Sequence, residues 1–118
     1  MKYYIEVSDD EHYLNPYEIA TIFGVYSKAN KPHSRFVARL MTNYYNLHAD
    51  TPKFYFNGSK GLSRVYPACI YAPIMLDLLN KYESDKEHAI QMGEKTHYFI
   101  IKTGEWLLCY TIYWYLVF

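Results

Sequence analysis

The chain has little cysteine and no excess of charge of either sign. Its 118 residues include two cysteines, Cys69 and Cys109, and equal numbers of Lys/Arg and Asp/Glu, at 12 each. Two cysteines are too few for a disulfide framework and have no metal-ligand spacing. We therefore expect two buried free thiols in a reducing compartment, with a single bridge between them as the alternative.

Long hydrophobic runs are also missing. The N-terminal segment, Met1 to Asp10, has no apolar core and soon turns acidic, so we expect no signal peptide and a cytoplasmic protein. The most apolar stretch, Trp106 to Phe118, has 13 uncharged residues, whereas a membrane-spanning helix needs about 20. Its Tyr, Ile, Val and Trp favour a strand, so no membrane partner is expected.

Motifs that carry catalysis or hold cofactors are absent as well. The sequence has no glycine-rich phosphate loop, no nucleophile elbow and no zinc cluster. His48 and Asp50 are two metal-capable side chains without a third nearby. Glu87-His88 and Glu94 to His97 lack a partner set, so we interpret them as solvated charge. A nuclease or relaxase that uses a tyrosine is the enzymatic alternative, but no feature selects one tyrosine. We expect no enzyme, no metal and no cofactor.

Aromatic residues, in contrast, are abundant. The chain contains fifteen Tyr, six Phe and two Trp. Because tyrosine has an apolar body and a polar tip, such a chain can fill a core and still leave amphipathic surface for a partner. The length suits one domain around one core, so we expect residues 1–118 to form a single domain.

The charges are sorted along the chain. Residues 28–64 carry seven Lys/Arg against one acid, Asp50, while residues 1–27 have a net charge of −4 and residues 65–118 a net charge of −2. A basic middle between acidic ends is the pattern expected of a nucleic-acid binder.

Hydrophobic periodicity and turn residues predict an α+β fold. The expected elements, in chain order, are a strand at 2–8, helices at 17–23 and 33–47, a hairpin with arms 53–56 and 62–66, a helix at 73–83, and a second hairpin with arms at 96–101 and from 106 onward. Asn15-Pro16 is a typical helix start and Gly24 a typical helix end. The charged residues 84–95 are expected to form a helical tail or loop. We expect the C-terminal aromatic hairpin, 96–118, to pair with the N-terminal strand.

The helix at 33–47 is predicted to have one buried and one polar face. The buried stripe consists of apolar residues at helical spacing, namely Phe36, Val37, Leu40, Met41 and Tyr44. The opposite face carries Arg35, Arg39, Asn43 and Asn46. This polar face is either a solvated helix surface or a binding surface.

Glu18 to Val25 resembles the first helix and turn of a helix-turn-helix motif. Ala20 matches the small residue that lets the helices approach, and Gly24 with Val25 matches the turn. The loop from Tyr26 to Pro32 is longer than the usual turn, which favours the winged variant with a hairpin after the second helix. Residues 15–66, under half of the chain, are similar to the winged helix-turn-helix domains of phage and plasmid regulators.

The resemblance implies a small regulatory protein of a phage or mobile element. It would bind duplex DNA through the helix at 33–47 and the hairpin at 53–66. The arginines would enter the major groove or grip phosphate, the asparagines would pair with adenine or phosphate, and the hairpin cations would contact the backbone. The residues expected to bind nucleic acid are Lys28, Lys31, Arg35, Arg39, Asn43, Asn46, Lys53, Lys60 and Arg64. We expect Arg35, Arg39 and Lys60 to lie on one exposed face.

The alternative is a protein of another class, an inhibitor or accessory factor without catalytic activity. An example is a viral product that blocks a host or defence complex, whose basic middle meets an acidic host protein. Hairpin cations that point the same way as Arg35 and Arg39 would favour the DNA binder, and scattered cations would favour the inhibitor.

The apolar C-terminal segment is expected to join two copies. A homodimer through residues 106–118 would bury this segment and would suit a two-fold DNA site. The alternative is burial within one copy, with strands 2–8 and 96–101 beside it in one sheet.

Overall fold

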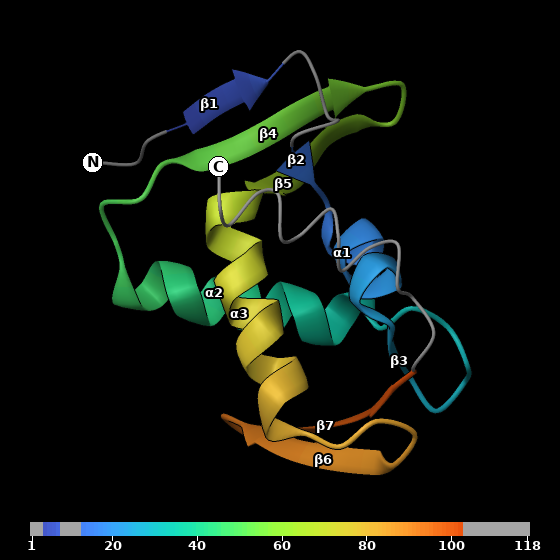
Figure 1. Ribbon diagram of the computed structural model, residues 1–118. Helices are drawn as coiled ribbons and strands as arrows, with labels where there is room; N and C mark the ends of the chain where they lie inside the picture. Colours follow the sequence, from blue (N-terminus) through green and yellow to red (C-terminus); the bar gives the residue numbers. More distant parts are fainter. Residues whose placement is uncertain (1–3, 8–12, 103–118) are drawn as a thin grey trace.

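The computed structural model describes residues 4–7 and 13–102 and shows an α+β fold, as the sequence predicts (Figure 1). The elements of these residues, in chain order, are β1 (Tyr4–Val7), β2 (Tyr13–Leu14), α1 (Pro16–Phe23), β3 (Val25–Tyr26), α2 (Ser34–Leu47), β4 (Lys53–Gly58), β5 (Gly61–Pro67), α3 (Ala68–Lys81), β6 (Glu87–Met92) and β7 (Lys95–Ile101). No helix among them is long and apolar enough to cross a membrane.

The strands form two sheets with the helices between them. One sheet has the order β1-β4-β5-β2 and the other the order β3-β7-β6. In Figure 1 the first sheet lies above the helices and the second below them. β1 pairs with β4 in parallel, whereas the β4–β5 and β6–β7 hairpins are antiparallel.

One apolar core joins the helices to both sheets. The α1 residues predicted to be buried, Ile19, Ala20 and Phe23, all belong to it. On α2 the predicted stripe is buried at Phe36, Val37 and Met41, while Leu40 and Tyr44 are partly buried and pack against the core. The Phe36 ring stacks on Phe99 of β7 with centroids 4.7 Å apart, so α2 is tied directly to the lower sheet.

Local signals fix both ends of α1 where the sequence predicts them. The Asn15 Oδ1 accepts the Glu18 N–H at 2.8 Å, and the Glu18 Oε1 accepts the Asn15 N–H at 3.0 Å, which forms a capping box. Gly24 ends the helix with φ 70°, in the left-handed region that glycine adopts readily. α2 begins after His33, within one residue of its predicted start.

The prediction for the third helix is wrong at its start. α3 begins at Ala68 rather than at residue 73, and Pro73 lies inside the helix. Proline cannot donate a backbone hydrogen bond, so this position normally disfavours a helix interior. Here the helix is stabilised by burial of Ile70, Tyr71 and Ala72 in the core, which offsets the lost bond. Cys69 in its first turn is exposed, so the expectation that this thiol is buried is wrong.

The prediction for residues 84–95 is also wrong. They contain strand β6, which pairs with β7 through a turn at Gly93, where φ is 64°. β6 tolerates charged residues because it is the last strand of its sheet and alternate side chains face solvent.

Among the described residues, the first arm of the predicted C-terminal hairpin does not pair with the N-terminal strand. β7 pairs with β6 and β3, while β1 pairs with β4, so the strands expected at 2–8 and 96–101 lie in different sheets. A tight turn joins β6 to β7 with less loss of chain entropy than a distant partner requires. The other predicted arm, from residue 106 onward, and the homodimer through 106–118 lie outside the described residues.

Candidate nucleic-acid interface

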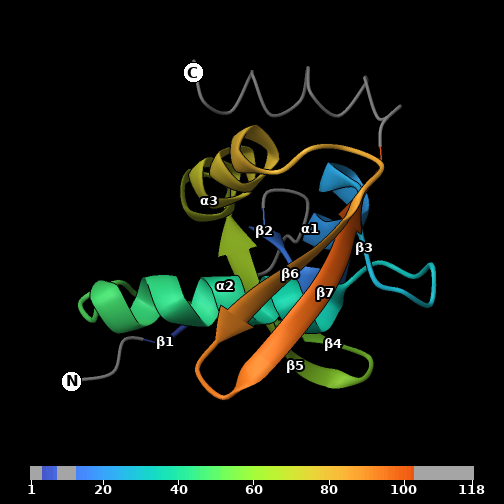
Figure 2. The same ribbon diagram turned by 90° about the horizontal axis from the view of Figure 1, so that it is seen from below.

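The exposed side of α2 lies beside two hairpins. In Figure 2, α3 lies on one side of α2, and the tips of the β4–β5 and β6–β7 hairpins extend on the other. A hollow of about 560 Å³ separates α2 from the β6–β7 turn. We call this hollow the central groove; its polar lining includes Arg35, Arg39, Glu94, Lys95 and His97.

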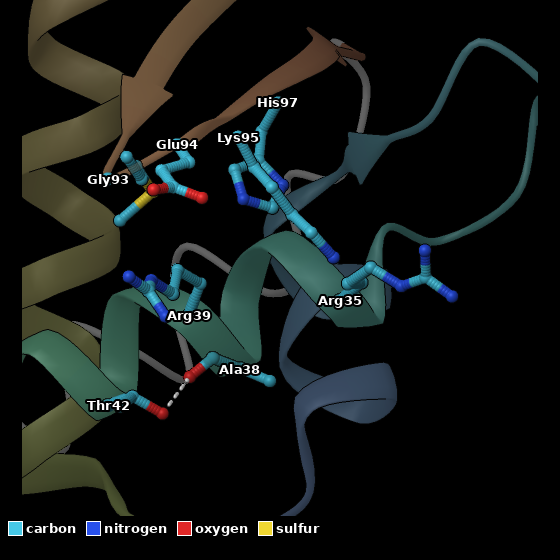
Figure 3. Close-up of a pocket in the computed structure, with 9 residues that line it drawn as sticks. Arg35, Ala38, Arg39, Thr42, Gly93, Glu94, Lys95 and His97 are labelled. Carbon is cyan, nitrogen blue, oxygen red and sulfur yellow. Dashed lines mark hydrogen bonds between the residues drawn. The ribbon is translucent and has the colours of Figure 1, made fainter.

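Two elements supply the cations of the central groove (Figure 3). Lys95 and His97 are two residues apart on β7, so they lie on the same face of the strand and reach over α2. The Arg39 guanidinium lies beneath the turn, where its Nη2 would be 3.2 Å from a Cβ added at Gly93. Arg35 extends from the start of α2, away from Arg39.

The positive charges of the groove are not neutralised by ion pairs. Within residues 4–7 and 13–102 the ion pairs are Lys28–Glu87, Lys81–Asp77 and Lys86–Glu83, and none of them involves a groove residue. Among the residues that the structure describes, Glu94 is the only acid that lines the groove. The groove therefore presents three full positive charges against one negative charge, which favours an anionic ligand.

Two imidazoles lie at the edge of this positive region. The side chain of His97 is 6% exposed, and its pKa is lowered by burial and by the charges of Arg39, Lys95 and Arg35. The pKa of His33 is lowered by burial and by His97, whose ring centroid is 6.1 Å away. Both rings contact Phe36, with centroid distances of 5.7 and 5.6 Å. These shifts favour the neutral form of both imidazoles at pH 7.

Shallow hollows extend the groove in both directions along the surface. One hollow shares Arg35, Lys95 and His97 with the central groove and continues to Lys28 in the loop before α2. Another shares Arg35 and continues to Ser63 on β5, and a further hollow continues from Ser63 to Lys60 in the β4–β5 turn. Arg35 thus lines both the hollows beside the β6–β7 hairpin and the hollow that leads to the β4–β5 hairpin.

The structure brings together some of the predicted binding residues. Arg35 and Arg39 are both exposed and line the same groove. Lys28 lies in the adjoining hollow, where it pairs with Glu87 at 3.3 Å and its Nζ lies 4.0 Å from the Tyr98 ring centroid. Lys60 lines a separate hollow with Asn15 and Glu18, connected to Arg35 only through the hollow between them.

Other predicted residues lie elsewhere. Lys31 and Asn46 are exposed, Asn43 and Lys53 are half-buried, and none of these four lines the hollows described above.

Arg64 was expected to contact the DNA backbone from an exposed position, but its surroundings in the structure are different. Its guanidinium carbon lies 4.4 Å from the Tyr45 ring centroid, 5.3 Å from that of Tyr66 and 5.7 Å from that of Tyr55. Its Nε is buried without a hydrogen-bond partner among the described residues. Burial also raises the pKa of Tyr45 and of Tyr66, so both phenols stay protonated. The Arg64 side chain is therefore half-buried against these three tyrosines and is only partly exposed at the surface.

Lys95, His97 and His33 were not predicted to belong to the site. The available signal was the two-residue period of Lys95, His97 and Phe99, which places their side chains on one face of a strand. That signal does not reveal what the face meets, because the packing of β7 on α2 joins residues far apart in the sequence.

Within the described residues no three or more His, Cys, Asp or Glu side chains are arranged to hold a metal ion. No protein-family model, curated protein sequence or solved structure matches this chain.

Proposed function

We propose that the protein is a small cytoplasmic regulatory protein of winged helix-turn-helix type that binds duplex DNA. Support comes from the chain order of α1, α2 and the β4–β5 hairpin, which is the order of that motif. The observation that carries the proposal is the central groove, which Arg35, Arg39 and Lys95 line without ion-pair partners among the described residues.

Each cation would act on DNA in the way its chemistry allows. A guanidinium forms paired hydrogen bonds with guanine or with phosphate oxygens, so Arg35 and Arg39 would supply most of the directed contacts. Lys95 and Lys60 are flexible point charges that would contact the phosphate backbone on either side. The β6–β7 hairpin would thus add a second backbone contact to that of the β4–β5 wing.

The test is a charge reversal on α2. The double variant Arg35→Glu with Arg39→Glu should lose binding to a mixed-sequence DNA duplex, measured by fluorescence anisotropy at low salt. Its thermal transition should stay close to that of the parent, because both side chains are exposed. Lys81→Glu with Lys86→Glu changes the net charge equally but away from the groove, so it should bind nearly as well as the parent. Equal binding by the two double variants would contradict the proposal.

The second candidate is an accessory factor that binds an acidic protein surface. It is favoured by Lys31 and Lys53, which lie outside the hollows around Arg35 and so scatter part of the basic charge. A parent protein that fails to bind duplex DNA even at low salt would favour this candidate over the DNA binder.

A further inference from the structure

The central groove places a buried imidazole near a cluster of cations that have no ion-pair partner among the described residues. We propose that the groove holds a single phosphate group, and that His97 takes up a proton when the phosphate enters. The identification of this phosphate as one from DNA rests on the proposed function, whereas the anion site itself rests on the groove.

The groove offers a phosphate both shape and charge. Arg39 has a planar fork of donors that can bind two phosphate oxygens at once, and Lys95 adds a charge from the opposite wall. Gly93 allows this arrangement, because the turn passes over Arg39 where a Cβ would be only 3.2 Å from Nη2. The hollow of about 560 Å³ leaves space for a phosphate with its sugar and with water.

The charged groups around His97 disfavour its protonated form. Arg35 and Arg39 face it from α2, Lys95 precedes it on β7, and His33 faces it from the segment before α2. Glu94 lines the same groove from the turn. Burial and three positive charges disfavour the imidazolium, and a single carboxylate does not outweigh them.

A bound phosphate reverses this balance. Its negative charge offsets the cations around His97 and gives the protonated ring an acceptor, so the proton affinity of the ring rises. Linkage is reciprocal, so protonation of His97 must raise the affinity for phosphate by the same factor. Phosphate binding should therefore strengthen as the pH falls.

His33 limits the response to one proton. Its ring lies 6.1 Å from that of His97, and a charge on either ring disfavours a charge on the other. The pair should therefore take up one proton when the groove fills, and we assign it to His97 because that ring lines the central groove.

The first measurement uses sulfate as the probe. Sulfate keeps a constant charge over the range in which imidazole titrates, so any change of affinity with pH comes from the protein. We would follow the imidazole proton resonances by NMR against pH, with and without saturating sulfate. The His97 midpoint should rise by about one pH unit, equivalent to a tenfold gain in sulfate affinity on protonation. His48, exposed at the C-terminal end of α2 and outside the lining of the groove, is the internal reference. Equal shifts at His48 and His97, or none at His97, would overturn the proposal.

Variants separate the site from general electrostatics. His97→Gln should bind sulfate with an affinity that hardly depends on pH, while His48→Gln should behave as the parent does. His97 is buried, so Lys95→Gln serves as a second variant on an exposed side chain, and it should lower both the sulfate affinity and the His97 shift. Retention of the full shift in Lys95→Gln would count against the site.

Gly93→Ala and Gly61→Ala form a matched pair. Both glycines have positive φ, but only a Cβ at Gly93 meets Arg39, whereas a Cβ at Gly61 meets nothing within 4 Å. Only Gly93→Ala should weaken sulfate binding, by several fold. Equal sulfate affinities in the two variants would contradict the placement of Arg39 in the site.

Binding experiments with duplex DNA distinguish this proposal from the proposed function. Sulfate-dependent protonation of His97 without duplex binding would support the anion site and contradict the DNA-binding function. Duplex binding with the same pH dependence in the parent and in His97→Gln would support the DNA-binding function and overturn the proton uptake.

Discussion

At the scale of single residues, the most informative group is His97. It is buried beside Phe36, whose ring stacks on Phe99, and the cations near it line an open groove. The same side chain therefore packs inside the protein and lines the candidate interface. A change in its protonation should affect both the stability of the fold and the charge of the interface. The Arg64 guanidinium among Tyr45, Tyr55 and Tyr66 is a similar case at the other hairpin.

The stability of the fold should depend on pH through His97 and His33. Their pKa values are lowered in the folded protein, so the unfolded chain binds more protons near the ordinary imidazole value of about 6.5. Their contribution to stability is complete above that value and is lost as the pH falls below it, down to the folded-state pKa. In urea unfolding between pH 7 and about pH 5, the parent should lose more free energy of unfolding than His97→Gln does.

The exposed His48 supplies the control for this measurement. His48→Gln keeps both buried imidazoles, so it should lose stability with falling pH as the parent does. Parallel curves for the parent and His97→Gln would show that His97 does not titrate differently in the folded protein.

At the scale of elements, the parts with local signals could be predicted from the sequence. Asn15-Pro16 and Gly24 bound α1, and the apolar stripe with opposite arginines defines α2 and half of the candidate site. The β4–β5 hairpin is marked by its turn. Those signals act between residues near one another in the chain, which is why they can be read without a structure.

The other half of the site depends on contacts between distant residues. β6 reads as a polar loop because its exposed positions carry Glu87 and Gln91, and only pairing with β7 makes it a strand. Pro73 reads as a helix start, although burial of the preceding turn extends α3 back to Ala68. Lys95 and His97 reach Arg39 because β7 packs on α2, and this contact joins residues far apart in the sequence, so sequence patterns could not place them in the groove.

The junction after α1 offers a sharp test of the packing between elements. A Cβ on Gly24 would lie 2.6 Å from the backbone oxygen of Lys102, and φ there is 70°. Gly24→Ala should therefore destabilise the protein by at least about 2 kcal/mol in urea unfolding, since the left-handed conformation alone costs 1–2 kcal/mol. Gly61→Ala also has a positive φ but no close neighbour, so it should lose less. Equal losses would mean that the chain after β7 does not pack against Gly24.

At the scale of the whole molecule, two small sheets enclose a helical layer (Figure 1), and Arg35, Arg39 and Lys95 line one groove beside α2. The basic middle and the acidic C-terminal part of the chain therefore contribute to the same surface. β7, which follows the basic segment, contributes Lys95 to the groove of Arg35 and Arg39.

The homodimer through residues 106–118 stays a prediction. Sedimentation at micromolar concentration should give a mass about twice the 14.1 kDa of one chain. Trp114→Lys should shift the protein to the monomer, because a charge would be buried without a partner in an apolar interface. A monomeric parent would contradict this prediction.

The most direct test of the central claim is the salt dependence of duplex binding. If Arg35, Arg39, Lys95 and Lys60 each neutralise a phosphate, the logarithm of the association constant should fall linearly with the logarithm of salt concentration, with a slope of about −3.6. Arg39→Gln should reduce the magnitude of that slope by about one, and Lys81→Gln should leave it unchanged. A slope near zero in the parent, or equal slopes in the parent and in Arg39→Gln, would contradict the account of the groove as a DNA-binding surface.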